Sequence, residues 1–312
     1  MRVITQLGAT SPDRALVVEA YPDVELIDFT GGEPPPGLAA DAFFGGYMGW
    51  PDILGWLDAA AVRWVQLSGT GVDNVPREVF DGRTVTCARG ASAVPISEFV
   101  MAAILSFAKR LPTTFLHEPP KYWNFPIPQF DAVAGSTLGL VGLGGIGAAI
   151  ARRARAFDMR VVAVRRTQTP SPVEGVEMVT ALDDLLPVVD HLVLAAPATD
   201  RTRGMIGAEA LARVKPGVHI VNIARGSLID QDALRAALDD DRVAQATLDT
   251  VTPEPLPAGH WLYEHPKVNV CAHVSWYSPA LQRAAVEIFT DNLGRFIRGE
   301  PLQYIVDVSE GY

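Results

Sequence analysis

Short apolar runs alternate along most of the chain with segments in which apolar residues recur at helical spacing. In the N-terminal part, the runs that predict strands are Arg2–Leu7, Val24–Phe29, Ala42–Phe44, Trp64–Leu67 and Thr84–Cys87. Between them, Ser11–Tyr21 and Trp50–Ala61 are predicted to be helices. Strands that alternate with helices in this way favour a parallel sheet covered by helices, so the predicted fold class is α/β.

A long apolar helix, predicted over Pro95–Leu111, leads into a second set of strands and helices. The strands predicted beyond it include Glu177–Val179, His191–Leu194, His219–Asn222, Gln245–Leu248 and Val268–Val270. The helices predicted between them are Ala181–Leu186, Ala208–Val214 and Asp230–Asp239. This pattern indicates a second, doubly wound sheet. A last helix is predicted over Pro279–Arg298, and the tail Tyr304–Val308 is predicted to return to the first domain.

A glycine-rich turn joins a strand to a helix in the middle of the chain. The turn comprises Gly142, Gly144, Gly145, Ile146 and Gly147, between the apolar run Ser136–Val141 and an alanine-rich helical stretch. In such a unit Gly142 allows the turn, Gly144 lets the backbone approach a pyrophosphate, and Gly147 lets the helix pack closely on the strand. The motif alone is a weak signal, and a glycine turn that binds nothing is the alternative. Its position between strand and helix favours a dinucleotide site.

The strand after the glycine turn, Met159–Val164, is predicted to end beside the adenosine ribose. An enzyme that uses NAD usually carries Asp or Glu there, whereas this chain has Arg165, Arg166 and Thr167. Two guanidinium groups and a hydroxyl suit a 2′-phosphate, so NADP(H) is the preferred cofactor, with NAD(H) possible as well. The alternative is that these arginines are solvated surface residues.

Composition and charge indicate the cellular compartment and argue against some classes of partner. The chain has 312 residues, of which 48% are hydrophobic and 20% charged, enough for two domains with cores of their own. A net charge of −10 argues against nucleic acid or an anionic membrane as a partner. Cys87 and Cys271 show neither metal-ligand spacing nor a disulfide framework, and no apolar stretch reaches membrane-spanning length. We therefore expect a cytoplasmic protein without a metal.

Three polar segments each follow a predicted strand in the second half of the chain: Asn222–Ser227, Thr247–Pro257 and Asn269–Ser275. In an open α/β sheet the C-terminal ends of the strands line the ligand crevice. Four side chains are therefore expected to converge there although they are far apart in sequence: Arg225, Asp249, Glu254 and His273.

These segments, with Gly69–Asn74, Ile96–Phe99 and the glycine turn, resemble the D-isomer-specific 2-hydroxyacid dehydrogenase family, and within it the glyoxylate/hydroxypyruvate reductases. The likeness covers nearly the whole chain. It implies a Rossmann-type dinucleotide-binding domain at 98–280, inserted into a flavodoxin-like substrate domain made of 1–97 and 281–312. It also implies a homodimer.

The resemblance implies a role for each matching residue. Arg225 would bind the substrate carboxylate and polarise the keto oxygen, on which negative charge develops during hydride addition. His273 would be the general acid in reduction and the base in reverse. Glu254 would fix the histidine tautomer and favour the imidazolium.

Further residues of the matching segments would contact the ligands. The resemblance implies that Asp249 holds the nicotinamide carboxamide and that Ala224 also lies against the cofactor. The backbone N–H groups of Thr70 and Gly71 would receive the substrate carboxylate.

The function that follows is hydride transfer between NADP(H) and a small 2-ketoacid or D-2-hydroxyacid, such as glyoxylate or hydroxypyruvate. One alternative is a nicotinamide-sensing, corepressor-like binding protein, which the presence of Arg225, Glu254 and His273 disfavours. Another is oxidation of formate or phosphite. Formate dehydrogenases pair their histidine with Gln, so Glu254 argues against formate, while phosphite stays open.

Overall fold

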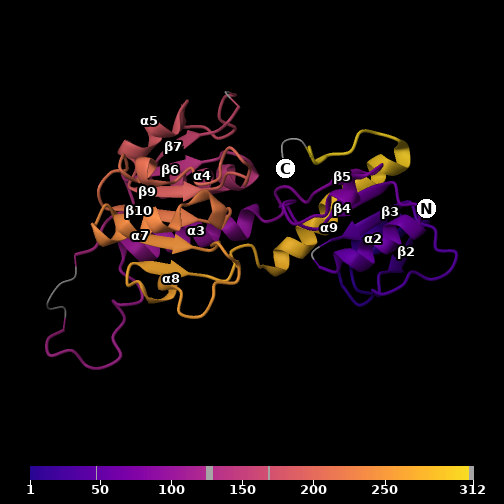
Figure 1. The fold of residues 1–312 in the computed structure, drawn as a ribbon, viewed down its shortest axis with the longest axis horizontal. Helices are drawn as coiled ribbons and strands as arrows, with labels where there is room; N and C mark the ends of the chain where they lie inside the picture. Colours follow the sequence, from indigo (N-terminus) through magenta and orange to yellow (C-terminus); the bar gives the residue numbers. More distant parts are fainter. Residues whose placement is uncertain (47, 124–128, 168, 309–312) are drawn as a thin grey trace. The chain divides into compact units, whose positions relative to one another are not determined.

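A computed structural model describes residues 1–46, 48–123, 129–167 and 169–308. The chain forms two compact units, one made of Met1–Ser92 with Tyr277–Tyr312 and the other of Ala93–Trp276 (Figure 1). Each unit contains one parallel sheet, which confirms the predicted fold class of two α/β domains with parallel sheets. Residues 309–312 of the predicted substrate domain lie outside the described residues, and the ligand assigned to each predicted domain stays a prediction.

The first unit is a five-stranded sheet in the order β2-β1-β3-β4-β5. Its strands are β1 Arg2–Thr5, β2 Glu25–Asp28, β3 Ala42–Gly45, β4 Trp64–Leu67 and β5 Thr84–Thr86. Ile4, Phe43 and Val65 belong to a buried cluster with Trp56 and Leu57, which come from helix α2 (Trp50–Ala59). One face of the sheet is thus closed by α2.

The long helix α9 (Pro279–Arg298) supplies aromatic packing in the same unit. Phe289 on this helix stacks on Phe44 of β3 and on Trp64 of β4, with ring centroids 4.6 and 5.6 Å apart. Residues after α9 reach the edge strand, because Ile305 forms an antiparallel bridge to Thr86. The tail therefore returns to the first unit, as predicted.

The second unit is a seven-stranded sheet in the order β12-β11-β10-β9-β6-β7-β8. Its strands are β6 Thr137–Val141, β7 Arg160–Val164, β8 Val176–Val179, β9 His191–Leu194, β10 Val218–Asn222, β11 Val243–Leu248 and β12 Val268–Val270. Figure 1 shows the sheet running from β7 through β6, β9 and β10 towards α8. The chain leaves β6 in one direction to β7 and returns on its other side as β9, so the strand order reverses between β6 and β9. Ligands of open α/β sheets bind at such a reversal.

Both faces of this sheet are buried. Leu192 and Leu194 of β9 belong to one apolar cluster and Val193 between them belongs to another, as the alternation of side chains along a strand requires. Helices α3 (Ala93–Ala108) and α4 (Gly145–Ala156) contribute to the cluster that contains Val193. The other helices of the unit are α5 Leu182–Leu185, α6 Ala208–Leu211, α7 Gln231–Asp239 and α8 Trp261–Glu264.

Some predicted bounds were wrong. Helix α1 runs over Arg14–Ala20 and does not begin at Ser11, because Gly8–Arg14 forms turns, with the Ser11 N–H donating to Gly8 O. Helix α3 ends at Ala108 and does not reach Leu111, since Arg110 has a φ of +52°. Short helices that the sequence did not indicate are α8 and the 3₁₀ turns Arg77–Phe80, Leu186–Val188 and Gly226–Leu228. In the described ranges, no helix is both long and apolar enough to cross a membrane.

Candidate functional site

The glycine turn after β6 has little room at two of its glycines and open space at a third. A Cβ on Gly142, whose φ is +102°, would lie 2.7 Å from the carbonyl carbon of Ala195, and one on Gly147 would lie 2.3 Å from Gly142 O. A Cβ on Gly144 would meet nothing within 4 Å. Close backbone packing thus requires glycine at positions 142 and 147, whereas Gly144 leaves the backbone accessible to a ligand.

Helix α4 begins directly at this turn. The Ala148 N–H donates to Gly144 O at 2.9 Å, so the earlier N–H groups, those of Gly145 and Ile146 included, have no carbonyl one turn back along the helix. A helix N-terminus also carries partial positive charge. The open face at Gly144 and these N–H groups therefore fit the pyrophosphate of a dinucleotide.

Arg165 follows β7, which pairs with β6 so that Val164 lies opposite Val141 beside the glycine turn. Its Nη2 donates to Thr169 O at 2.5 Å and to Pro170 O at 2.7 Å, and it also contacts Thr169 Oγ1. Its Nε is buried and has no hydrogen-bond partner within the described part of the chain. Arg166 and Thr167 are exposed. Cationic side chains thus stand at the strand end where the ribose of a dinucleotide is expected.

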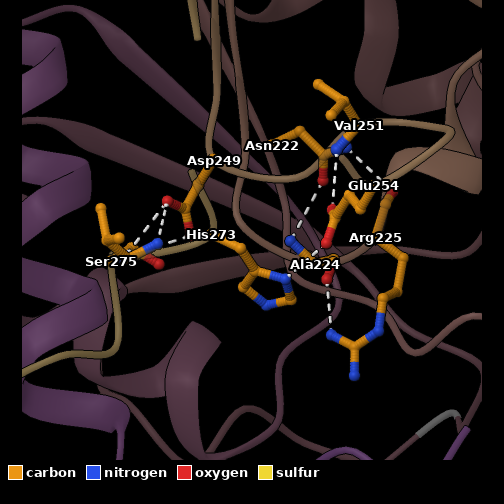
Figure 2. A network of polar contacts seen from close by, with 9 residues as sticks. Asn222, Ala224, Arg225, Asp249, Val251, Glu254, His273 and Ser275 are labelled. Carbon is orange, nitrogen blue, oxygen red and sulfur yellow. Dashed lines mark hydrogen bonds and ion pairs between the residues drawn. The ribbon is translucent and has the colours of Figure 1, made fainter. Parts of the chain in front are cut away.

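Arg225, Asp249 and His273 come together because β10, β11 and β12 are adjacent parallel strands. Backbone hydrogen bonds extend the sheet beyond the strand ends: the Asp249 N–H donates to Asn222 O at 2.9 Å, and the His273 N–H donates to Asp249 O at 2.9 Å. The expected convergence of Arg225, Glu254 and His273 is visible in Figure 2.

His273 and Glu254 form the central contact of the site. His273 Nδ1 lies 2.9 Å from Glu254 Oε2, and each side chain is 37% exposed. The other carboxylate oxygen accepts a hydrogen bond from the Val251 N–H at 3.0 Å. Because Nδ1 faces the carboxylate, Nε2 lies on the far side of the ring, where it can meet a reacting oxygen. The imidazole and the Arg225 guanidinium both point towards the lower part of the view in Figure 2.

Asp249 fixes the backbone that follows this histidine. Its side chain is buried, with 1% exposed, and accepts from the Val274 N–H at 2.8 Å and from the Ser275 N–H at 3.1 Å. His273 has a φ of +53°, a conformation that non-glycine residues adopt only when the surroundings hold it. The sequence did not indicate these backbone contacts, and the contact of Asp249 with a nicotinamide stays a prediction.

The loop that carries Arg225 is shaped by Asn222 and Gly226. The buried Asn222 amide accepts from the Ala224 N–H at 3.1 Å and donates to Arg225 O at 2.9 Å. Arg225 Nη1 in turn donates to Ala224 O at 2.7 Å. A Cβ on Gly226 would lie 2.0 Å from the carbonyl carbon of Val251, so only glycine lets the two loops touch.

Thr70 and Gly71, expected to bind the substrate carboxylate, belong to the first unit. Thr70 Oγ1 donates to Ala88 O at 3.1 Å, which ties this loop to the one after β5. Their approach to Arg225 stays a prediction, as do the roles of all the residues described above.

His191 and His219 form a buried pair, although sequence analysis assigned them no role. They lie opposite each other on β9 and β10, with their Nδ1 atoms 3.4 Å apart, and His219 Nε2 lies 3.0 Å from Thr247 Oγ1. The Phe107 ring stacks on His219 at 4.6 Å. Burial lowers the pKa of His191 to about 4 and that of His219 to about 3, so both rings are neutral at pH 7. The sequence signal that could have indicated this pair is the position of each histidine at or near the start of a buried strand.

The surroundings of the two thiols disfavour their reactive, ionised form. Burial raises the pKa of the Cys87 thiol, and burial with the nearby Asp249 carboxylate raises that of Cys271, so neither favours the reactive thiolate. The described ranges contain no group of three or more His, Cys, Asp or Glu side chains arranged to hold a metal ion.

Comparisons with known proteins identify relatives. A family model described as "D-isomer specific 2-hydroxyacid dehydrogenase, NAD binding domain" matches residues 101–275. A glyoxylate reductase of Korarchaeum cryptofilum is 34% identical over 78% of this chain and 75% of the relative. A D-3-phosphoglycerate dehydrogenase of Methanocaldococcus jannaschii is 31% identical over 80% of this chain, which spans about half of that relative (48%).

Solved structures agree with these matches. An NADPH-dependent glyoxylate/hydroxypyruvate reductase of Sinorhizobium meliloti, solved with NADP and sulfate, superposes with a TM-score of 0.80. The two are 25% identical, and the alignment covers 100% of this chain and 99% of that one. With its two parallel-sheet units and its matched central segment, the chain belongs to the D-isomer specific 2-hydroxyacid dehydrogenase family.

Proposed function

We propose that the protein reduces a small 2-ketoacid with NADPH and, in reverse, oxidises the D-2-hydroxyacid. The observation that carries this proposal is the hydrogen bond of 2.9 Å between His273 and Glu254, which lies with Arg225 at the C-terminal edge of the sheet that also carries the glycine turn. An imidazole oriented by a carboxylate, beside a guanidinium, is the set of groups that carbonyl reduction needs. Glyoxylate and hydroxypyruvate are the proposed substrates.

The nicotinamide cofactor, when bound, supplies the hydride that adds to the carbonyl carbon. Arg225 binds the substrate carboxylate and stabilises the negative charge that grows on the oxygen. His273 Nε2 donates its proton to that oxygen, which becomes the hydroxyl, and the neutral ring then takes a proton from solvent. Glu254 accepts from Nδ1, so it fixes the ring orientation and stabilises the imidazolium.

The preference for NADP(H) over NAD(H) rests on the end of β7. Arg165 and Arg166 supply positive charge there, and no carboxylate occupies the position that would accept the ribose hydroxyl of NAD. The Sinorhizobium meliloti relative is NADPH-dependent by its description. Family likeness also supports a homodimer, which light scattering would test. Two cysteines without metal-ligand spacing or a disulfide framework favour the cytoplasm, which cell fractionation would test.

The test follows the absorbance of the reduced nicotinamide with the purified protein. NADPH and NADH are each offered with glyoxylate, hydroxypyruvate, phenylpyruvate and a branched 2-ketoacid, and formate and phosphite are offered with NADP⁺ and NAD⁺. We expect ketoacid-dependent oxidation of NADPH that is lost in His273→Ala. Oxidation of phosphite without reduction of any ketoacid would reject the proposal in favour of the alternative dehydrogenase activity.

A further inference from the structure

The His273–Glu254 contact depends on a loop whose backbone is held by a side chain from a different element. Glu254 reaches His273 from the segment that begins at Asp249, and its second oxygen is bonded to the Val251 N–H within that segment. The orientation of the carboxylate therefore depends on the path of the backbone between Val251 and Glu254.

Gln231 holds that backbone through both ends of its amide. Its Nε2 donates to Thr252 O at 2.5 Å, and its Oε1 accepts from the Thr252 N–H at 3.3 Å. A primary amide has one donor end and one acceptor end, so it matches the N–H and C=O of a single residue as a neighbouring strand would. Of the residues between Val251 and Glu254, Thr252 thus has its backbone fixed from outside the loop.

The backbone at Gln231 is itself held in place by the start of a helix. Gln231 is the first residue of α7, whose N-cap Asp230 accepts from the N–H groups of Asp232 and Ala233 at 3.0 and 3.1 Å. The helix is anchored in the core by the buried Leu234, among others. A side chain at this position can therefore transmit the position of α7 to the loop.

We infer that Gln231 is a positioning residue, which acts through Thr252 to hold the Glu254 carboxylate against His273 Nδ1 and so keeps the imidazole oriented for proton transfer. The inference rests on the proposed function and adds to it a residue that touches neither substrate nor cofactor. Without the amide, the loop would lose two hydrogen bonds, and the carboxylate would spend less time at Nδ1.

The test observes the contact directly, by NMR of protein labelled with ¹⁵N in its histidine rings, in wild type and in Gln231→Ala. We expect the His273 Nδ1–H resonance, which the hydrogen bond to Glu254 protects from exchange with water, to broaden or disappear in Gln231→Ala. In steady-state kinetics kcat for ketoacid reduction should fall by roughly 10-fold with little change in KM or cofactor binding, because a displacement of about 1 Å can cost up to about 10²-fold in rate. Gln231→Glu, which keeps the acceptor but loses the donor, should behave like Gln231→Ala.

Asp232→Ala is the matched control, because it removes an exposed carboxylate from the first turn of the same helix while leaving both the Asp230 cap and the Gln231 amide in place. Its Nδ1–H resonance and kcat should equal those of wild type. A Gln231→Ala protein with an unchanged resonance and kcat would overturn the inference, as would equal changes in Asp232→Ala. Glu254→Gln separates the two proposals: a change there without one in Gln231→Ala rejects only the role of Gln231, and a wild type that reduces no ketoacid rejects the proposed function as well.

Discussion

The buried His191–His219 pair should make the second unit sensitive to acid well above the pH at which carboxylates titrate. Histidine has a pKa near 6.5 in an unfolded chain, whereas burial lowers it to about 4 for His191 and about 3 for His219. Below pH 6.5 the unfolded chain therefore binds protons that the folded one cannot. Stability is retained above that pH and is lost as the pH falls towards the two folded pKa values.

The size of the loss follows from the same values. At pH 5 each neutral ring costs about 2 kcal/mol relative to its protonated form in the unfolded chain, so the pair lowers the free energy of unfolding by about 4 kcal/mol between pH 8 and pH 5. A typical domain is stable by only about 5–15 kcal/mol, so the effect is large. Although burial opposes it, the hydrogen bond from Lys215 holds the pKa of the Asp190 carboxylate below its usual value. Asp190 therefore does not add to the change between pH 8 and pH 5.

Urea unfolding, followed by circular dichroism at a series of pH values, measures this free energy. The control is His191→Asn, in which an amide replaces one titrating ring, and the pH dependence between pH 8 and pH 5 should then fall by about half. A wild-type protein whose free energy of unfolding changes by less than about 1 kcal/mol over that range would refute the reasoning. A free energy of unfolding that depends on pH equally in His191→Asn and in wild type would refute it as well.

The other predictions concern catalysis and cofactor choice. His273→Ala should lower kcat for ketoacid reduction by roughly 10²–10⁴-fold with cofactor binding retained, as measured by steady-state kinetics and fluorescence titration. Arg225→Lys should also be severely impaired, because an ammonium cannot reproduce a planar guanidinium, and a near-normal kcat/KM would contradict that role. Arg165→Asp should move the NADPH/NADH ratio of kcat/KM towards NADH, since one charged hydrogen bond contributes about 1.5–3 kcal/mol, or about 10–150-fold; an unchanged ratio at matched ionic strength would make this arginine a surface residue only. Gly226→Ala should lower both stability and kcat/KM, because its Cβ would lie 2.0 Å from a backbone carbon of the neighbouring loop. Gly55→Ala, whose Cβ meets nothing within 4 Å, should lower neither.

The strands could be predicted closely because parallel strands buried on both faces read as short continuous apolar runs. Trp64–Leu67 and His191–Leu194 match β4 and β9 residue for residue. Helix α8, Trp261–Glu264, was missed because a single turn is too short to show a helical period. Helix ends were predicted less well, since they depend on local turns such as the one at Arg110.

The convergence of Arg225, Glu254 and His273 could be predicted because each follows a strand of one parallel sheet. The hydrogen bonds that hold these side chains in place could not be predicted. The bonds from Asp249 to the backbone after His273, and those from Gln231 to Thr252, depend on the path of loops rather than on residue spacing. The histidine pair required the strand order, which brings β9 next to β10.

Arg225, Glu254 and His273 all lie within Ala93–Trp276, as do the partners in the hydrogen bonds described for them. The hydrogen bond of 2.9 Å between His273 and Glu254 therefore joins two residues of one unit, whereas Thr70 and Gly71 belong to the other. The groups that we propose for acid–base chemistry can thus be kept while the other unit is exchanged. A chimaera that takes Met1–Ser92 and Tyr277–Tyr312 from a relative should inherit a different choice of substrate and keep the His273–Glu254 hydrogen bond.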